Sequence, residues 1–341
     1  MLEIWADKIS TLDVSFTRRL RRFVLERIEL LAPSSPNWLS GLALKFIKFC
    51  SFYGNRESKY LNLIFTRLLP ANPLQIGRKY LPTVLICAPK DLEVLPLSLV
   101  SAVENLSGSE KLWILSPESM ISDVRKLLNS LKIEAEIIID EDLIAEFFGH
   151  SQVIIQKAAR MQLLKLLAVI SLPCDEILVA DGDTLYMKPR NWLMSNKVVY
   201  PVSQEYLVRH KNFNRGRLRL SSTSGLGFVT HHQVVFKESV QEIVLRAGGV
   251  VALAQIMQSV YANTENWHRE YPSEWQFLGD FLYKHTEYEL VPARFANLAI
   301  SRNVLAVDFC SISTSTEGRS ELNRIAKSVP EAYSISLHAY K

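Results

Sequence analysis

The chain has 341 residues, of which 48% are apolar and 22% are charged. This composition excludes a disordered chain, and 13 Gly and 14 Pro exclude a collagen-like or low-complexity one. A chain of this length suits one large α/β unit or two ordinary domains. It has no charge-free apolar run long enough to span a bilayer, and its first residues lack a basic-then-apolar signal pattern. We therefore expect a cytoplasmic protein.

Positive charge is concentrated in the first quarter of the chain. Residues 1–80 carry 13 Lys+Arg against 6 Asp+Glu, whereas the remainder carries 26 against 29. Apolar residues from Trp5 to Leu31 recur every three to five positions, which predicts a helix with arginines on its opposite face. We expect residues 1–80 to form a basic amphipathic helical extension, either on a membrane surface or as a cap on the main domain. The charges form no long run with interleaved aromatics, so nucleic acid is not an expected partner.

From residue 81 the sequence alternates between strand and helix patterns. The predicted strands cover 83–88, 111–115, 134–139 and 176–180, and the predicted helices cover 92–106, 116–131 and 153–170. This order predicts a parallel sheet with helices on both faces. Ligands of such sheets bind beyond the carboxyl ends of the strands.

The second half of the chain is less regular. Strands are predicted over 198–202, 225–230, 287–292 and 303–309, and helices over 233–246, 250–261 and 273–284. Gly248-Gly249 provides a stop between the first two of these helices.

Two carboxylates, Asp181 and Asp183, directly follow the strand predicted over 176–180, and Gly182 lets the chain turn between them. Carboxylates this close repel one another unless a cation or a donor compensates. Hard oxygen ligands favour Mg²⁺ or Mn²⁺, and such an ion can hold a diphosphate. The alternative is a solvated turn after a strand.

The stretch EILVADGDTLYMKP, residues 176–189, resembles the Asp-x-Asp region of GT-A-fold glycosyltransferases. Its apolar strand, its two aspartates and the Lys188-Pro189 pair that follows them resemble the same region in an uncharacterised bacterial branch of these enzymes. Three further features fit that branch: Gln162 and Lys165 on the preceding helix, Ser273-Glu274-Trp275 at the start of a late helix, and His338 near the chain end. The resemblance covers residues 81–341. It implies a GT-A-like, mainly parallel sheet flanked by helices, preceded by the helical extension.

The resemblance also implies roles for individual residues. Asp181 would contact the ribose or the metal, Asp183 the metal, and His338 would complete the site for Mn²⁺ or Mg²⁺. Glu274 would be the catalytic base of an inverting reaction, with Asp280 as a second candidate. The donor-binding candidates are Lys90, Asp91, Gln162, Lys165, Asp181 and Gly225.

Three of these residues have plainer alternatives. His338 fits an exposed tail histidine, and Gly225 a bend in a strand. Ser273 and Gln276 match a capping box, in which Glu274 complements the helix dipole.

The function expected from these observations is metal-dependent transfer of a sugar from a nucleotide-sugar donor to a glycan, lipid-linked or other envelope acceptor. The basic extension would then place the protein at the inner face of the membrane. One alternative is a haloacid-dehalogenase-type phosphohydrolase, whose strand also ends in Asp-x-Asp. Another is a non-catalytic, GT-A-like binding module associated with a membrane.

Overall fold

The computed structural model describes Ala43, Thr66 and residues 68–149, 156–203, 208–220, 226–263, 265, 267, 269–302 and 307–338. The helix predicted from Trp5 to Leu31, and nearly all of the basic extension, lie outside these residues. Residues 69–78, at the end of the predicted extension, contact the part of the chain that follows. The Arg78 amide donates to the Leu193 carbonyl at 2.8 Å, and Leu74 is buried against Val199 and Ala293.

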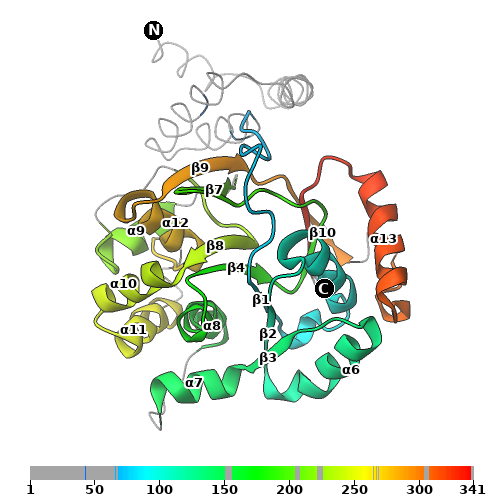
Figure 1. The fold of residues 1–341 in the computed structure, drawn as a ribbon. Coiled ribbons are helices and arrows are strands. Elements are labelled where there is room, and N and C mark those ends of the chain that lie inside the picture. Colours follow the sequence, from blue (N-terminus) through cyan, green and yellow to red (C-terminus); the bar gives the residue numbers. More distant parts are fainter. Residues whose placement is uncertain are drawn as a thin grey trace, which may run out of the picture.

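A five-stranded sheet forms the centre of the molecule (Figure 1), in the order β3-β2-β1-β4-β8. Its strands are β1 (Thr83–Ile86), β2 (Leu112–Ser116), β3 (Glu136–Ile139), β4 (Glu176–Asp181) and β8 (His232–Phe236). The first four are parallel and β8 is antiparallel to β4. The expected α/β fold with a mainly parallel sheet is therefore confirmed.

The strand order creates a switch point beside β1. The chain moves outward from β1 through β2 to β3, and then returns to place β4 on the other side of β1. The connections after β1 and β4 therefore leave the sheet in opposite directions, and open α/β sheets bind ligands in the crevice between the carboxyl ends of two such strands, here called the β1–β4 crevice. Ile86 and Asp181 are register partners at this edge.

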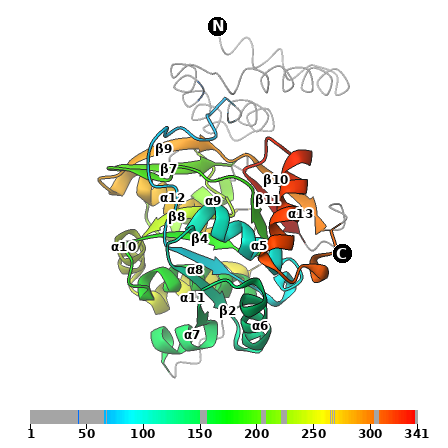
Figure 2. The same ribbon diagram turned by 45° about the vertical axis from the view of Figure 1, so that its right-hand side comes forward.

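Helices cover both faces of the sheet (Figures 1 and 2) because alternate strand residues point to opposite sides. Val84 and Ile86 belong to one buried cluster and Leu85 to the other. The first cluster packs on α7 (Asp140–Phe148), α8 (Lys157–Ser171), α10 (Lys237–Ala247), α11 (Val250–Tyr261) and α12 (Glu274–His285). The second packs on α5 (Leu95–Ala102), α6 (Ile121–Leu131) and α13 (Ser315–Ser328).

Two small sheets flank the central one. One has the order β6-β7-β9, formed by Leu193–Met194, Lys197–Val202 and Glu289–Arg294. The other has the order β10-β11-β5, formed by Asn297–Ser301, Ser334–His338 and Thr184–Tyr186. Since β5 follows the Asp181–Asp183 turn and pairs with β11, the end of the described chain returns to the carboxyl edge of the central sheet. Helix α9 (Val208–Gly216) packs on α12.

Several predicted boundaries were wrong. The helix expected from residue 233 begins at Lys237, because the buried run His232–Phe236 is β8. Short apolar runs fit a buried strand and a buried helix equally well, so their period does not decide between them. The described residues 226–230 form no strand, and Phe309 starts a 3₁₀ turn. Asp140 opens α7, which was not predicted.

Among the described residues, no single helix is long and apolar enough to cross a membrane. Helices α10 and α11 meet that criterion only as a pair, and they are bent by 73° at the break between them.

Candidate functional site

The crevice between β1 and β4 brings two loops together. Gly182 donates its amide to the Ile86 carbonyl at 2.8 Å, which pins the Asp181–Asp183 turn to the end of β1. A Cβ at Gly182 would lie 2.7 Å from that carbonyl oxygen and 3.0 Å from Cys87 Sγ. The close approach of the two loops therefore requires glycine at this position. On the other side of the turn, the Leu337 amide of β11 donates to the Asp183 carbonyl at 2.7 Å.

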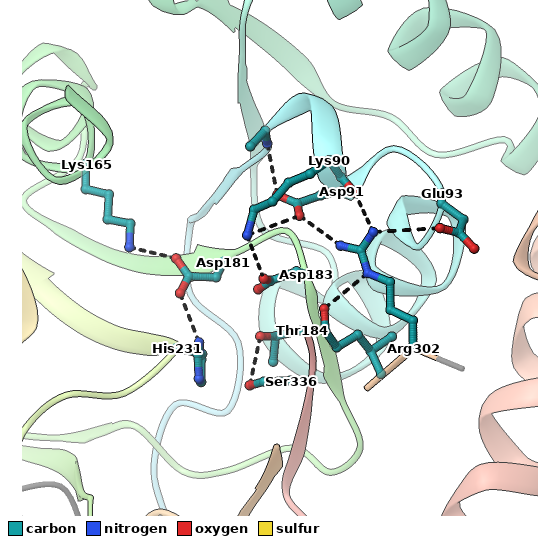
Figure 3. Close-up of polar contacts among 12 residues, drawn as sticks. Lys90, Asp91, Glu93, Lys165, Asp181, Asp183, Thr184, His231, Arg302 and Ser336 are labelled. Carbon is teal, nitrogen blue, oxygen red and sulfur yellow. Dashed lines mark hydrogen bonds and ion pairs between the residues drawn. The ribbon is translucent and has the colours of Figure 1, made fainter. Parts of the chain in front are cut away.

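Asp181 is held from two sides (Figure 3). Lys165 Nζ, from α8, lies 2.7 Å from Asp181 Oδ1, and His231 Nδ1 lies 3.1 Å from Oδ2. Burial raises the pKa of the Asp181 carboxyl, but Lys165 and His231 outweigh it and hold the pKa well below its usual value. Asp181 is thus kept ionised and fixed in orientation.

The same lysine reaches a second carboxylate. Lys165 Nζ lies 2.6 Å from Glu274 Oε1 and 4.3 Å from the centre of the Trp275 ring. Burial lowers the pKa of the Lys165 ammonium, but Asp181 and Glu274 outweigh it and hold the pKa above its usual value. Lysine seldom lies in an apolar helix face unless it is paired, and here it bridges two acids.

Asp183 faces the other wall of the crevice (Figure 3). The 3₁₀ turn Pro89–Asp91 after β1 brings Lys90 Nζ to 3.4 Å from Asp183 Oδ2. Lys90 Nζ also lies 3.8 Å from Asp91 Oδ1, and Arg302 Nη2 lies 3.1 Å from the same oxygen. Burial, with a further contribution from Asp183, raises the pKa of Asp91 to about 6.

Asp181, Asp183 and His231 could hold a metal ion together. One ligand atom of each lies within 4.8 Å of those of the other two. Carboxylate oxygens with one imidazole suit Mn²⁺ or Mg²⁺ better than a soft metal. The chemistry and the spacing of this donor set therefore fit a hard divalent cation. His231 was not among the expected ligands, and the side chain of His338, the expected third ligand, lies outside the described residues.

His231 and Arg302 were not singled out from the sequence. The only sequence signal for His231 was its place in a His-His pair between a predicted strand, 225–230, and a predicted helix, 233–246. Arg302 immediately follows β10 and is 8% exposed. It had no sequence signal, because its partner Asp91 is 211 residues away.

Other predicted residues lie elsewhere. Gln162 donates to the Tyr261 hydroxyl at 2.6 Å and to the Pro272 carbonyl at 3.3 Å, so it joins α8 to α11 and to the start of α12. Asp280 is fully buried and accepts from Asn214 Nδ2 at 2.8 Å, in the contact between α12 and α9. Gly225 and the His338 side chain lie outside the described residues.

The expected capping box at α12 is half correct. The Gln276 amide donates to Ser273 Oγ at 3.5 Å, as a capping serine requires. The Gln276 side chain does not return to the cap. It accepts from the Phe228 amide and donates to the Leu226 carbonyl, and thereby fastens the segment before β8 to α12.

A cavity of about 970 Å³ lies at the opposite edge of the sheet, where β2 and β3 begin. Four of its charged lining residues pair with one another: Lys111 contacts Glu136, and Arg319 lies 2.5 Å from Glu104. The cavity brings together no group of carboxylates comparable to the one at the crevice. The β1–β4 crevice is therefore the candidate active site.

No protein-family model and no curated protein matches this chain. Similar solved structures include mouse xyloside xylosyltransferase 1, with 15% identity, a TM-score of 0.41, and coverage of 65% of this chain and 87% of that one. The galactosyltransferase LgtC in complex with donor and acceptor sugar analogues has 12% identity, a TM-score of 0.41, and coverage of 75% and 87%. The bifunctional glycosyltransferase WbbM has 10% identity, a TM-score of 0.43, and coverage of 79% and 47%. All three are glycosyltransferases, the class that the sequence resembles.

Proposed function

We propose that this protein is a metal-dependent glycosyltransferase that uses a nucleotide-sugar donor. The observation that carries the proposal is the position of Asp181, Asp183 and His231 at the switch point of the central sheet, with their ligand atoms within 4.8 Å of one another. Open α/β sheets bind ligands in this crevice, and a hard cation there can hold a diphosphate.

The residues around the crevice have separable tasks in this proposal. Asp183, Asp181 and His231 would hold the cation, which would supply positive charge to stabilise a departing diphosphate. Lys165 keeps Asp181 ionised and aimed. Lys90, at the mouth of the crevice, supplies a positive charge for phosphate oxygens.

Glu274 remains the candidate base of an inverting reaction. Its side chain is buried, and its Oε1 is engaged by Lys165 at 2.6 Å. The pairing also makes Glu274 a positioning residue for Lys165, so a pH–rate profile of Glu274→Gln would separate the two roles. Loss of the acidic limb, along which the rate rises with pH as the base ionises, identifies a base, whereas a uniform loss of rate identifies a positioning residue.

The acceptor and the location of the protein are the second part of the proposed function. We propose a glycan or lipid-linked acceptor, a cytoplasmic location and contact with the inner face of the membrane. The basic composition of residues 1–80 supports the membrane contact, because basic side chains are attracted to anionic lipid. The test is binding of the full chain to vesicles with and without anionic lipid, compared with a variant that replaces Arg18, Arg19, Arg21 and Arg22 with Glu. Equal binding of the two proteins would exclude the membrane role.

The phosphohydrolase alternative requires Asp181 to attack phosphorus. Each Asp181 oxygen is engaged, by Lys165 at 2.7 Å and by His231 at 3.1 Å, which makes this carboxylate a weak nucleophile. The geometry therefore favours charge stabilisation and metal binding over covalent catalysis by Asp181.

The proposal is tested by thermal stability in a panel of nucleoside diphosphates and nucleotide sugars, with and without Mn²⁺. A ligand that binds only the folded state raises the melting temperature once its concentration exceeds Kd. We expect one nucleotide to stabilise the protein in the presence of metal. The shift should vanish in Asp183→Asn and persist in the control Asp123→Asn, on the exposed surface of α6. No shift with any nucleotide, or a shift that survives Asp183→Asn, would contradict the proposal.

A further inference from the structure

Lys90 and Lys165 approach the same acidic turn but differ in how firmly they are held. The Lys165 side chain is 10% exposed and contacts two carboxylates within 2.7 Å. The Lys90 side chain is 56% exposed, and its two carboxylate contacts are at 3.4 and 3.8 Å. Lys165 is therefore a buried lysine held by two ion pairs, whereas Lys90 is an exposed lysine with two longer and weaker ion pairs at the entrance of the crevice.

The backbone that carries Lys90 is fixed even though its side chain is exposed (Figure 3). Arg302 Nη1 donates to the Lys90 carbonyl, and Arg302 Nε donates to the Leu337 carbonyl at 3.2 Å. The Ala88 amide donates to Asp91 Oδ2 at 3.1 Å. These contacts brace the 3₁₀ turn against β11. Motion of Lys90 is thus restricted to its side chain, which pivots about a fixed Cα.

Lys90 lies where a divalent cation would be repelled by it. Its ammonium is 3.4 Å from the Asp183 oxygen, and Asp183 is one of the three candidate metal ligands. Two positive charges cannot share that oxygen without repulsion. A lysine stem is long and flexible enough to move its ammonium to a neighbouring anion when one is present.

We propose that Lys90 is a tethered cation that competes with the divalent ion for Asp183 and transfers to the donor's diphosphate when nucleotide binds. This inference rests on the proposed function. It makes Lys90 a positioning residue through which metal and nucleotide binding are coupled. Because such coupling is reciprocal, nucleotide must tighten metal binding by the same factor by which metal tightens nucleotide binding.

The experiment measures binding rather than turnover, with the full chain. Mn²⁺ is titrated alone, and then in the presence of ADP, CDP, GDP or UDP, into the wild type, Lys90→Met and Lys90→Arg. The matched control is Lys327→Met, an exposed lysine in the last turn of α13. Because Lys90 is exposed, its replacement leaves the buried contacts of the fold in place.

We expect Mn²⁺ alone to bind Lys90→Met roughly 1.5- to fivefold more tightly than the wild type, a range typical of one partly exposed ion pair. With nucleoside diphosphate the advantage should disappear or reverse, because the variant lacks the charge that follows the phosphate. Lys90→Arg should behave as the wild type does, and so should Lys327→Met.

Equal Mn²⁺ affinity in the wild type and Lys90→Met, with unchanged coupling to nucleotide, would overturn this inference alone. Failure of both Mn²⁺ and every nucleoside diphosphate to bind the wild type would overturn the proposed function, and this inference with it.

Discussion

Asp181 and Asp183 lie two residues apart on one turn, yet their surroundings differ. Asp181 is held by a buried lysine that also holds Glu274, whereas Asp183 is approached by a lysine whose side chain is 56% exposed. The difference follows from the fold. Asp181 points toward Lys165 of α8 and toward His231, and Asp183 faces Lys90 in the 3₁₀ turn after β1 (Figure 3).

The ion pairs of Asp181 are therefore fixed parts of this site, whereas the ion pair of Asp183 with Lys90 can be exchanged. On the Asp181 side, removal of Lys165 deprives two carboxylates, Asp181 and the buried Glu274, of the cation that they share. On the Asp183 side, water and other cations can replace Lys90 at low cost. We call the side formed by Asp181, Lys165 and Glu274 the rigid wall, and the side formed by Asp183 and Lys90 the adjustable wall.

The largest expected effect breaks the rigid wall. Lys165→Met should lower the free energy of unfolding by about 3–5 kcal/mol, because the buried Glu274 loses its ion-pair partner and the half-buried Asp181 keeps only His231. Lys90→Met should cost less than about 1 kcal/mol. Urea denaturation measures both. The double variant Lys165→Met/Glu274→Gln should recover part of the loss, and equal losses in the two single variants would refute the contrast.

A second prediction uses pH. The Asp91 carboxyl has a pKa of about 6 in the folded chain and an ordinary value of 3.8. The unfolded chain therefore releases this proton first as pH rises, so stability contributed by Asp91 falls between about pH 4 and pH 6, by roughly 3 kcal/mol. Asp181 has the opposite sign: its pKa is depressed, so its contribution is lost as the pH falls below its ordinary value of 3.8.

The measurement is the free energy of unfolding against pH, in the presence of a metal chelator. Burial also raises the pKa of the Asp140 carboxyl to about 6, so Asp91→Asn should reduce the decline between pH 4 and pH 6 without abolishing it. Asp123→Asn should leave the whole decline in place. A decline that is unchanged in Asp91→Asn would show that another group is responsible.

A third prediction concerns Gly182, the residue between Asp181 and Asp183 that connects the two walls. Gly182→Ala should cost about 1–3 kcal/mol, because the new Cβ would lie 2.7 Å from the Ile86 carbonyl oxygen and would push β1 and the turn apart. Gly216→Ala, where the nearest atom is at 3.4 Å, should change stability by less than about 0.5 kcal/mol. Thermal or urea unfolding compares the two, and a neutral Gly182→Ala would show that the turn is not confined.

The smallest expected effect concerns the start of α12. Ser273 Oγ accepts the Gln276 amide at 3.5 Å, and the helix that it caps begins with Glu274. Ser273→Ala should cost about 1 kcal/mol. Ser273→Thr keeps the acceptor oxygen and should retain most of the stability in urea denaturation. If Ser273→Ala costs nothing, the cap does not support the rigid wall.

The elements that could be predicted from the sequence are those with strong local signals. The first four strands of the sheet were located because each is a short apolar run bounded by proline, glycine or charge, with a helix between successive strands. The placement of Asp181 and Asp183 followed directly from the end of β4. Local patterns failed at β8, where a buried apolar run precedes α10 without a break.

The partners within the site could not be predicted because they are distant in the sequence. Lys165 and Glu274 are 109 residues apart, Asp181 and His231 are 50 apart, and Asp91 and Arg302 are 211 apart. Periodicity and spacing carry no information about such pairs. The resemblance to GT-A enzymes led to Lys165 and Glu274 as separate candidates, but not to their contact.

The most direct test of the central claim is a crystal structure with Mn²⁺ and the nucleoside diphosphate that stabilises the protein, with data collected for anomalous scattering. The account predicts a manganese peak in the β1–β4 crevice, roughly 2 Å from an Asp183 oxygen and in contact with the diphosphate. A peak elsewhere, or a nucleotide bound away from this crevice, would contradict it.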